Sequence, residues 1–342
     1  MKRLIIMICA ALVLLSGCKS TPERYSAVYT DVFDTVTEFT AYCGSQREFD
    51  KLSEAAHAEL LRLHRIFDIY NSYDGVTNAY TLNVNSGGFP SEPIDIDESM
   101  LFYILTDSSP ELLEVITMAK EWYDLTGGRL NIAMGSVLSL WHDCRKSGIL
   151  PDADELLERA KHCDFDDVVI ENGCVFLNDP ELSFDFGALA KGYAAEKTAQ
   201  LLESMGDCSF ALSVGGNVVI RGEKPTGKWE IGVENPDGGI LAVVKISDVA
   251  IVTSGDYQRY FEVDGVRYHH IIDSETLYPA SLWRSVTIIC DDSGTADALS
   301  TALFCMPLEE GKELLKKFDA EALWVGIDGE ITRSEGFGSY EG

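Results

Sequence analysis

The sequence is short of basic residues. Its 342 residues contain 27 Lys and Arg against 56 Asp and Glu, which gives a formal net charge of −29. Proteins that bind nucleic acid without regard to sequence take their affinity from Lys and Arg on phosphates, so this function class is excluded. The same shortage argues against docking on anionic lipid. A phosphate-bearing ligand would need local help from backbone amides or a divalent cation.

The apolar run near the N-terminus is too short for a transmembrane helix. The run Leu4–Leu15 (LIIMICAALVLL) falls below the roughly 20 residues that a bilayer requires. It follows a basic start and ends in LSGC, which predicts a lipoprotein signal peptide over residues 1–17 and a lipid on the thiol of Cys18. The alternative is an uncleaved anchor with a chance cysteine. Residues 18–27 are then expected to form a lipidated tether, and processing would change the net charge to −31 because it removes Lys2 and Arg3.

The cysteines lack the spacing of a metal or redox motif. No C-x-x-C pair occurs, and none of the spacings is that of a zinc site. Several cysteines stand beside apolar residues, which is typical of small buried side chains. An exported protein with unpaired thiols suggests a weakly oxidising habitat. After removal of Cys9 with the signal peptide and attachment of lipid to Cys18, seven free cysteines would remain: Cys43, Cys144, Cys163, Cys174, Cys208, Cys290 and Cys305.

Hydrophobic periodicity predicts one mixed domain over residues 28–342, without internal repeats. Strand runs interrupted by separate helices favour an α+β fold over a doubly wound parallel sheet. Helices are predicted over 51–67, 110–125 (capped by Ser109 and stopped by Gly127-Gly128), 153–162, 189–205, 295–305 and 308–318. Strands are predicted over 28–42, 182–186 and repeatedly over 209–290, and hairpins at Asn172-Gly173, Asp264-Gly265 and Asp328-Gly329.

Two segments suggest a site for a phosphate and a metal. DFGALAKGY, residues 185–193, stands where a strand meets a helix, and free N–H groups at a helix start attract anions. In the second, Asp297 and Thr301 lie four residues apart on one helix face, with Ser300 adjacent and Thr295 as a possible cap. Carboxylate and hydroxyl oxygens suit Mg²⁺. Tight helix–strand packing and an ordinary exposed helix face are the alternatives.

Two further segments are ambiguous when taken alone. Adjacent residues on a strand face opposite sides, so His269 and His270 cannot both reach one site; one of them could be a general base, or a structural histidine. SVGGN (213–217) and TSGDY (253–257) end apolar strands with small residues, and could line a pocket or simply form turns.

Together, and in this order, these segments resemble the ApbE family of flavin transferases. DFGALAKGYAAE is similar to the family's D-x-G-x-x-A-K-G-Y motif, and SVGGN, TSGDYQRYF, HHIID and TADALSTALF match its later motifs. TGGRLNIAMGSVLSLW resembles its T-G-G-x-F-D-P-T segment, and FDT (33–35) and IYN (69–71) also have counterparts. The resemblance covers residues 28–335 and implies a single α+β domain of the ApbE type, related to the T-fold.

The resemblance also implies an activity. Family members use Mg²⁺ and FAD to attach FMN to a Thr or Ser hydroxyl of an exported partner protein, releasing AMP. It implies that Ala188 (through its carbonyl), Asp297 and Thr301, with Ser300 nearby, hold the metal, and that His270 is the base, with Asp297 also catalytic. Expected flavin contacts are Phe33, Tyr70, Arg129, Leu130, Asn131, Asp185, Lys191 and Ile272. The protein would work on the extracytoplasmic face of a bacterial cytoplasmic membrane, anchored through Cys18.

The sequence departs from the family pattern at three places. Asn131 replaces an Asp, and Ser274 and Leu277 replace a Pro and a Gly in the loop after the histidines. The first change removes a charge and keeps an oxygen acceptor, while the others affect the geometry of the loop. Two alternative functions remain: a Mg²⁺-dependent FAD pyrophosphatase that gives FMN and AMP, and a flavin-binding lipoprotein without catalysis.

Overall fold

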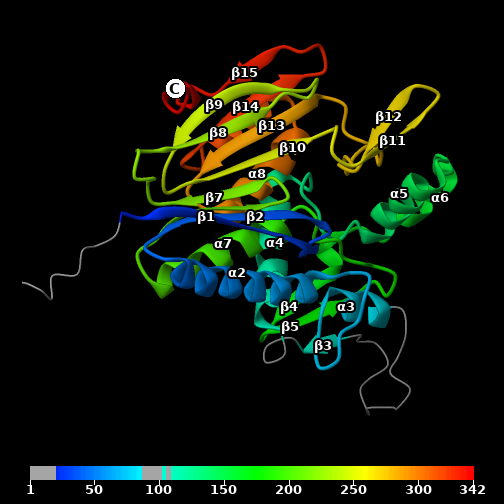
Figure 1. Ribbon diagram of the computed structural model, residues 1–342. Coiled ribbons are helices and arrows are strands. Elements are labelled where there is room, and N and C mark those ends of the chain that lie inside the picture. Colours follow the sequence, from blue (N-terminus) through cyan, green and yellow to red (C-terminus); the bar gives the residue numbers. More distant parts are fainter. Residues whose placement is uncertain (1–20, 87–101, 105–108) are drawn as a thin grey trace, which may run out of the picture.

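A computed structural model describes residues 21–86, 102–104 and 109–342, and shows an antiparallel eight-stranded sheet with helices packed on one face (Figure 1). The predicted signal peptide and Cys18 lie outside the described residues. The strands of the sheet, in spatial order, are β1 (Glu23–Val32), β2 (Thr35–Cys43), β6 (Ser209–Val214), β7 (Asn217–Arg221), β10 (Ala250–Gly255), β13 (Trp283–Cys290), β14 (Ala320–Gly326) and β15 (Ile331–Arg333).

Helices cover one face of this sheet because alternate side chains along a strand point to opposite sides. Val252 and Ile288 face the core formed with the helices, whereas their neighbours Ile251 and Ile289 belong to a second core under the ribbon β8 (Trp229–Glu234) and β9 (Ile240–Ile246). The helices are α2 (Gln46–Phe67), α3 (Ala79–Ser86), α4 (Pro110–Thr126), α5 (Gly135–Ser147), α6 (Ala153–Ala160), α7 (Ala190–Met205), α8 (Ser293–Phe304) and α9 (Leu308–Leu315).

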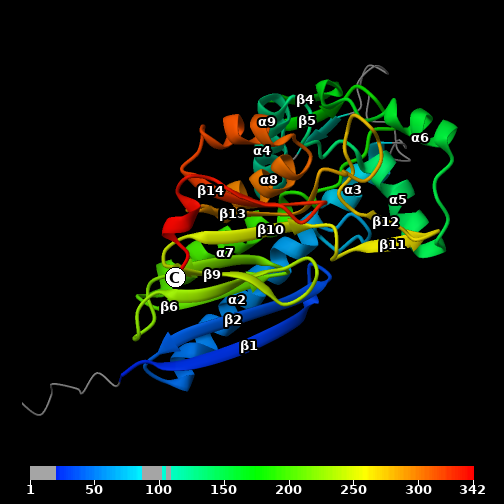
Figure 2. The same cartoon turned by 90° about the horizontal axis from the view of Figure 1, so that it is seen from above.

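Smaller elements extend the molecule to one side. The hairpin β11 (Tyr260–Val263) and β12 (Val266–His269) lies beside α5 and α6 in both views (Figures 1 and 2). Trp141 of α5 stacks on Tyr268 of β12, with ring centroids 6.0 Å apart, so this contact holds the hairpin. A further sheet contains β3 (Phe102–Ile104), β5 (Cys174–Leu177) and β4 (Val168–Glu171), and single 3₁₀ turns occur at Phe165–Asp167 and Phe337–Ser339.

The single α+β domain is confirmed, while several local predictions need correction. The strand predicted over 28–42 is a hairpin that turns at Phe33-Asp34, and its first strand begins at Glu23, so residues 23–27 belong to the domain and not to a tether. Residues 182–186 form no strand; only Ser183 makes an isolated bridge, with Met134. The sequence also missed α5 and α3, and the apolar residues of α3 follow no clear amphipathic period.

The structure confirms where α4 begins and ends, with Ser109 at its N-cap position and Gly127 at its C-cap, but it corrects the side-chain bonds predicted for two caps. The Ser109 hydroxyl bonds the carbonyl of Thr77 and makes no cap bond to α4. Asp292 caps α8 by accepting a bond from the Thr295 amide, so Thr295 lies within the helix. No helix among residues 21–86 and 109–342 is both long and apolar enough to cross a bilayer.

Candidate functional site

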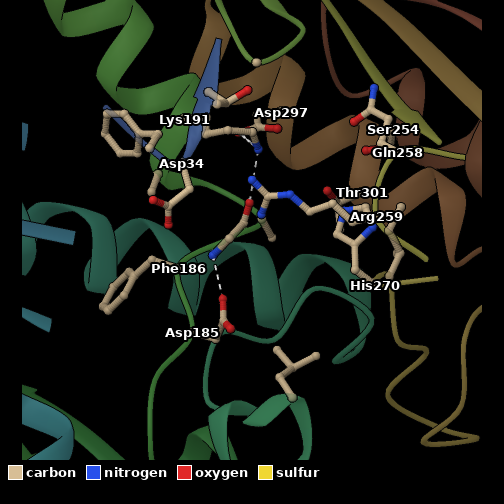
Figure 3. A pocket seen from close by; sticks show the side chains of 18 of the residues that line it. Asp34, Asp185, Phe186, Lys191, Ser254, Gln258, Arg259, His270, Asp297 and Thr301 are labelled. Carbon is tan, nitrogen blue, oxygen red and sulfur yellow. Dashed lines mark hydrogen bonds and ion pairs between the residues drawn. The ribbon is translucent and has the colours of Figure 1, made fainter. Parts of the chain in front are cut away.

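A cavity of about 1130 Å³ opens where the turn Phe33-Asp34, the end of α2, the start of α7, the β10–β11 loop and α8 meet (Figure 3). These segments are distant in the sequence, and the fold brings them together. Of the residues predicted to form the site, twelve line this cavity: Phe33, Tyr70, Arg129, Leu130, Asn131, Asp185, Ala188, Lys191, His270, Ile272, Asp297 and Thr301.

Asp297 is a buried carboxylate at the wall of the cavity. It is 3% exposed, and its Oδ2 accepts a hydrogen bond of 2.8 Å from the amide of Gly192. The ammonium of Lys191 lies 4.0 Å from the same oxygen. Burial raises the pKa of Asp297, against the lowering effects of Lys191 and of the Gly192 bond. A charged carboxylate in this position therefore favours a cation close by.

Ser300 lies beside the predicted metal ligands but behind the cavity wall. Its side chain is fully buried, and its hydroxyl bonds Ser254 at 2.8 Å and the carbonyl of Asp297 at 2.9 Å. Ser300 is absent from the cavity wall, unlike Asp297 and Thr301. The structure therefore gives Ser300 a supporting role: it ties α8 to β10 beside the predicted metal ligands.

The turn between β1 and β2 presents Phe33 and Asp34 to the cavity. Both residues have positive φ, of 53° and 49°, which a two-residue hairpin turn of this kind requires at its central positions. Such conformations cost about 1–3 kcal/mol each when the residue is not glycine. The amide of Phe33 donates to Nδ1 of His64 on α2 at 3.1 Å, and this bond helps to hold the turn.

Tyr70 and Asp185 also line the cavity and are linked through His142. The hydroxyl of Tyr70 lies 2.9 Å from Nδ1 of His142, and Nε2 of the same ring lies 3.9 Å from Asp185 Oδ2. The other oxygen of Asp185 accepts a bond from the Gly187 amide, which shapes the loop before α7. Burial lowers the pKa of His142, although Asp185 acts in the opposite direction.

Residues Arg129, Leu130 and Asn131 are held firmly by neighbours. Arg129 donates to the carbonyl of Cys305 and forms an ion pair of 3.0 Å with Glu275. Asn131 uses its amide to bond the carbonyl of Cys163, and its oxygen accepts from the Ala133 amide. The polar groups of Asn131 thus shape the backbone. Leu130, which is only 1% exposed, forms an apolar part of the cavity wall.

The side chains of the adjacent residues His269 and His270 point to different sides, as the alternation of side chains along a strand predicts. His269 bonds the carbonyl of Ala280 and is buried away from the cavity, whereas His270 lines it (Figure 3). Nδ1 of His270 is buried and has no hydrogen-bond partner among the described residues. Burial, followed by the positive charges of Arg259 and Lys191, lowers the pKa of His270 to about 3. The imidazole is therefore neutral at physiological pH.

Sequence reasoning missed two arginines. Arg145 of α5 and Arg259 of the β10–β11 loop line the cavity, and neither makes an ion pair with any other described residue. Figure 3 shows Arg259 extending into the cavity near His270 and Thr301. Arg259 belongs to the segment TSGDYQRYF, which matches a family motif, but no role was predicted for the arginine itself. In a chain of net charge −29, two unpaired cations in one cavity indicate an anionic ligand.

The residues at the wall fit a divalent cation that a ligand helps to hold. The described residues contain no group of three or more His, Cys, Asp or Glu side chains able to bind a metal unaided. Asp297, Thr301 and Ala188 all line the cavity and carry carboxylate, hydroxyl and carbonyl oxygens, and Mg²⁺ commonly completes a shell of such hard donors with substrate phosphate and water. The donor set therefore suits a metal that binds together with a phosphate-bearing substrate.

Comparison with known proteins finds relatives over most of the chain. The family model described as "ApbE family" matches residues 33–324. An FAD:protein FMN transferase of Treponema pallidum (strain Nichols) is 34% identical over 276 residues, covering 75% of this chain and 72% of the relative. One of Klebsiella pneumoniae (strain 342) is 32% identical over 286 residues, covering 82% and 86%. The crystal structure of the ApbE protein of Thermotoga maritima superposes with a TM-score of 0.79 at 31% identity, covering 94% of this chain and 100% of that one.

Proposed function

The chain belongs to the ApbE family, and on that basis we propose that it transfers the FMN part of FAD to a hydroxyl of a protein, releasing AMP. The observation that carries the proposal is the meeting of unlike groups in one cavity. A buried carboxylate (Asp297), unpaired cations (Arg145 and Arg259), a neutral histidine (His270) and an exposed aromatic ring (Tyr70) line the same space. That combination suits a ligand with a flat ring system and a diphosphate.

The reaction requires a hydroxyl to attack one phosphorus of the diphosphate. A new P–O bond forms to the acceptor, the bond to the AMP phosphate breaks, and the hydroxyl proton must be removed. Neutral His270 is placed at the cavity wall to take that proton. Lys191 and Arg259 would face the phosphate oxygens, and Phe33 and Tyr70 would pack against the isoalloxazine or adenine ring.

We propose Mg²⁺ as the cation, held by Asp297, Thr301 and the carbonyl of Ala188. When bound, the ion would neutralise the diphosphate oxygens and so stabilise the transition state. Lys191, 4.0 Å from Asp297, would balance the buried carboxylate and contribute a further positive charge. The net negative surface is compatible with an anionic substrate because these charges act locally.

The test is transfer of fluorescence to a partner. The full chain is incubated with FAD, Mg²⁺ and candidate protein fragments that offer a Thr or Ser acceptor, and the products are separated on a denaturing gel. A fluorescent partner band, with one AMP released per modified partner, is the expected result. AMP release without any acceptor protein would instead indicate an FAD pyrophosphatase. Tight FAD binding without AMP release at any metal concentration would indicate a flavin-binding protein.

Residues 1–18 suggest where the enzyme works. The basic start, the apolar run and LSGC support a lipoprotein anchored through Cys18 on the extracytoplasmic face of the bacterial membrane, with an exported or membrane-associated acceptor. Replacement of Cys18 by Ala should move the protein from the membrane fraction to the soluble extracytoplasmic fraction or leave its precursor uncleaved. Unchanged, processed protein in the membrane fraction would refute the anchor.

A further inference from the structure

Two cysteines face each other where the neighbouring strands β2 and β6 meet at one end, at a distance from the cavity. The sulfurs of Cys43 and Cys208 lie 3.6 Å apart, although the residues are 165 positions apart in the sequence. Strands β2 and β6 pair in a register that sets Tyr42 opposite Ser209, and the next pair in that register is Cys43 and Cys208. No other pair of cysteine sulfurs makes such a contact in the described part of the chain.

This arrangement suits a disulfide bond. Directly opposed residues of antiparallel strands have Cα atoms about 4.5–5.5 Å apart. A disulfide spans Cα separations of about 4.4–6.8 Å, so a pair that continues the β2–β6 register meets the requirement. The sulfurs need to approach by only about 1.5 Å to reach bonding distance, which small side-chain rotations can supply.

We propose that Cys43 and Cys208 form a disulfide that fastens β2 to β6. The thiolate of one cysteine attacks a sulfur of a disulfide-bearing oxidant, and a mixed disulfide forms as the first oxidant thiol leaves. The second cysteine thiolate then displaces the other oxidant thiol. The two cysteines lose two protons and two electrons, and the oxidant is reduced to two thiols.

The surroundings determine the order and the rate of these steps. Cys43 is 2% exposed, whereas Cys208 is only partly buried, so Cys208 is the accessible partner for the first attack. Burial raises the pKa of Cys43 to about 12 and also raises that of Cys208. Because the thiolate is the reactive form, the cross-link should form slowly at neutral pH and faster under alkaline conditions.

The cross-link would stabilise the fold without regulating the site. It closes a long loop, and a cross-link of this kind mainly restricts the unfolded chain. The β2–β6 ladder runs from Tyr42 and Ser209 to Thr37 and Val214, so the cysteine pair, one position beyond its first end, lies roughly 20 Å from Thr37 and Val214 at the usual rise per residue. Gly215, the next residue, lines the cavity, so the cross-link lies at the far end of the ladder.

Thiol mapping tests the proposal directly. Fully reduced chain is incubated with oxidised glutathione at pH 8.5, the remaining thiols are alkylated, and the protein is digested without reduction. We expect one cross-linked peptide pair joining Cys43 and Cys208, alkylation of the other five described cysteines, and a melting temperature roughly 5 °C higher than in the reduced protein. FMN transfer, or FAD binding if transfer is absent, should not change.

Matched variants separate the cross-link from general oxidation. Cys43→Ala and Cys208→Ala should each lose both the cross-linked peptide and the rise in melting temperature. Cys290→Ala, which removes a buried cysteine of β13, should keep both. Alkylation of Cys43 and Cys208 in folded, oxidised wild-type protein would overturn the proposal, and so would a persistent glutathione adduct on Cys208. These readouts are independent of the proposed enzymatic activity.

Discussion

The amide of Gly192 donates a 2.8 Å hydrogen bond to Asp297 Oδ2, and this bond joins the start of α7 to the helix that carries the predicted metal ligands. The two helices can approach this closely only because position 192 lacks a side chain. A Cβ atom there would lie 2.4 Å from Asp297 Cβ and 2.4 Å from the carbonyl oxygen of Ser293. Gly192, the second glycine of the motif DFGALAKGY, therefore allows the Asp297 carboxylate to lie against the start of α7.

Gly192→Ala should lower both stability and activity. The added methyl group forces α7 and α8 apart, and overpacking of this kind costs about 1–3 kcal/mol. Thermal or denaturant unfolding measures the loss of stability, and AMP release from FAD measures the loss of activity. Gly338→Ala is the control, because a Cβ at that position meets nothing within 4 Å. Equal stability of Gly192→Ala and wild type would show that the helices are not in the arrangement described.

Asp297→Asn should abolish metal-dependent turnover with little effect on shape. The amide keeps an oxygen acceptor for the Gly192 bond but loses the charge that attracts a hard cation, so we expect Mg²⁺ affinity and turnover to fall about 100-fold or more. Mn²⁺ titration in the presence of FAD, followed by magnetic resonance, measures binding apart from activity. Asp291→Asn, an exposed residue near the start of α8, is the control. Full activity of Asp297→Asn would refute the metal assignment.

The same carboxylate predicts how metal binding depends on pH. Burial raises the pKa of Asp297, so protons compete with the cation at a higher pH than at an exposed carboxyl group. Lowering the pH from 7 should therefore weaken Mn²⁺ binding in the wild-type protein. In Asp297→Asn the remaining weak binding should lose this dependence. A wild-type affinity that stays constant down to pH 4 would contradict the prediction.

His270→Gln should reduce transfer while leaving FAD binding nearly intact. Loss of a general base costs about 10²–10⁴-fold in rate. Since burial lowers the pKa of His270 to about 3, the imidazole of the free protein is already neutral at pH 5 and above. The profile of kcat/KM between pH 5 and 8 should thus lack an inflection from this residue. Stopped assays of AMP release and quenching of flavin fluorescence measure the two effects, with His57→Gln on α2 as the control.

Arg259→Ala should weaken FAD binding more than it slows the chemical step. The guanidinium extends into the cavity and has no ion-pair partner among the described residues, so it is available for the diphosphate. Charge-assisted hydrogen bonds are worth about 1.5–3 kcal/mol, which corresponds to roughly a 10- to 100-fold rise in Kd. The wild-type affinity should also fall more steeply with salt than that of the variant. Arg24→Ala, on the exposed strand β1, is the control.

Local patterns in the sequence predicted most of the elements, because their causes are local. The α2 helix follows its apolar spacing and the hairpin at Asn172-Gly173 follows its turn residues. The turn at Phe33-Asp34 was missed since Phe rarely adopts positive φ, and the turn persists through contacts such as the bond to His64. Long-range packing decides such positions, and one sequence does not reveal it.

The candidate site shows the same division between residues that local patterns predict and residues that only long-range packing brings together. Residues within motifs, such as Asp297 and His270, were found because their chemistry and spacing are visible in the chain. Ser300 was predicted to lie near the metal, but its hydroxyl is used in a bond to Ser254 on a different element. Arg145 was missed because it stands on a helix that the sequence did not indicate. Only the tertiary arrangement shows which side chains share a cavity.

Asp68 predicts how stability depends on pH. This residue ends α2 and is 7% exposed, and its carboxylate accepts bonds from the Tyr73 hydroxyl at 2.6 Å, the Asn71 side chain at 3.0 Å and the amide of Tyr70 at 2.7 Å. Burial tends to raise the pKa of Asp68, but these bonds, with one from the Asn71 amide, outweigh it, and the pKa is lowered. The folded state thus favours the ionised carboxylate.

The stabilisation from Asp68 is present above the unfolded-state pKa of about 3.9 and is lost as the pH falls through the lower folded-state pKa. Asp68→Asn should lower the free energy of unfolding at pH 7 by about 1–3 kcal/mol, since hydrogen bonds to a charged group are lost. The difference from wild type should shrink as the pH falls below about 4, where both proteins carry a neutral side chain. Urea unfolding at several pH values measures this, with exposed Asp74→Asn as the control. A difference that stayed constant down to pH 2 would mean that the charge of Asp68 contributes nothing.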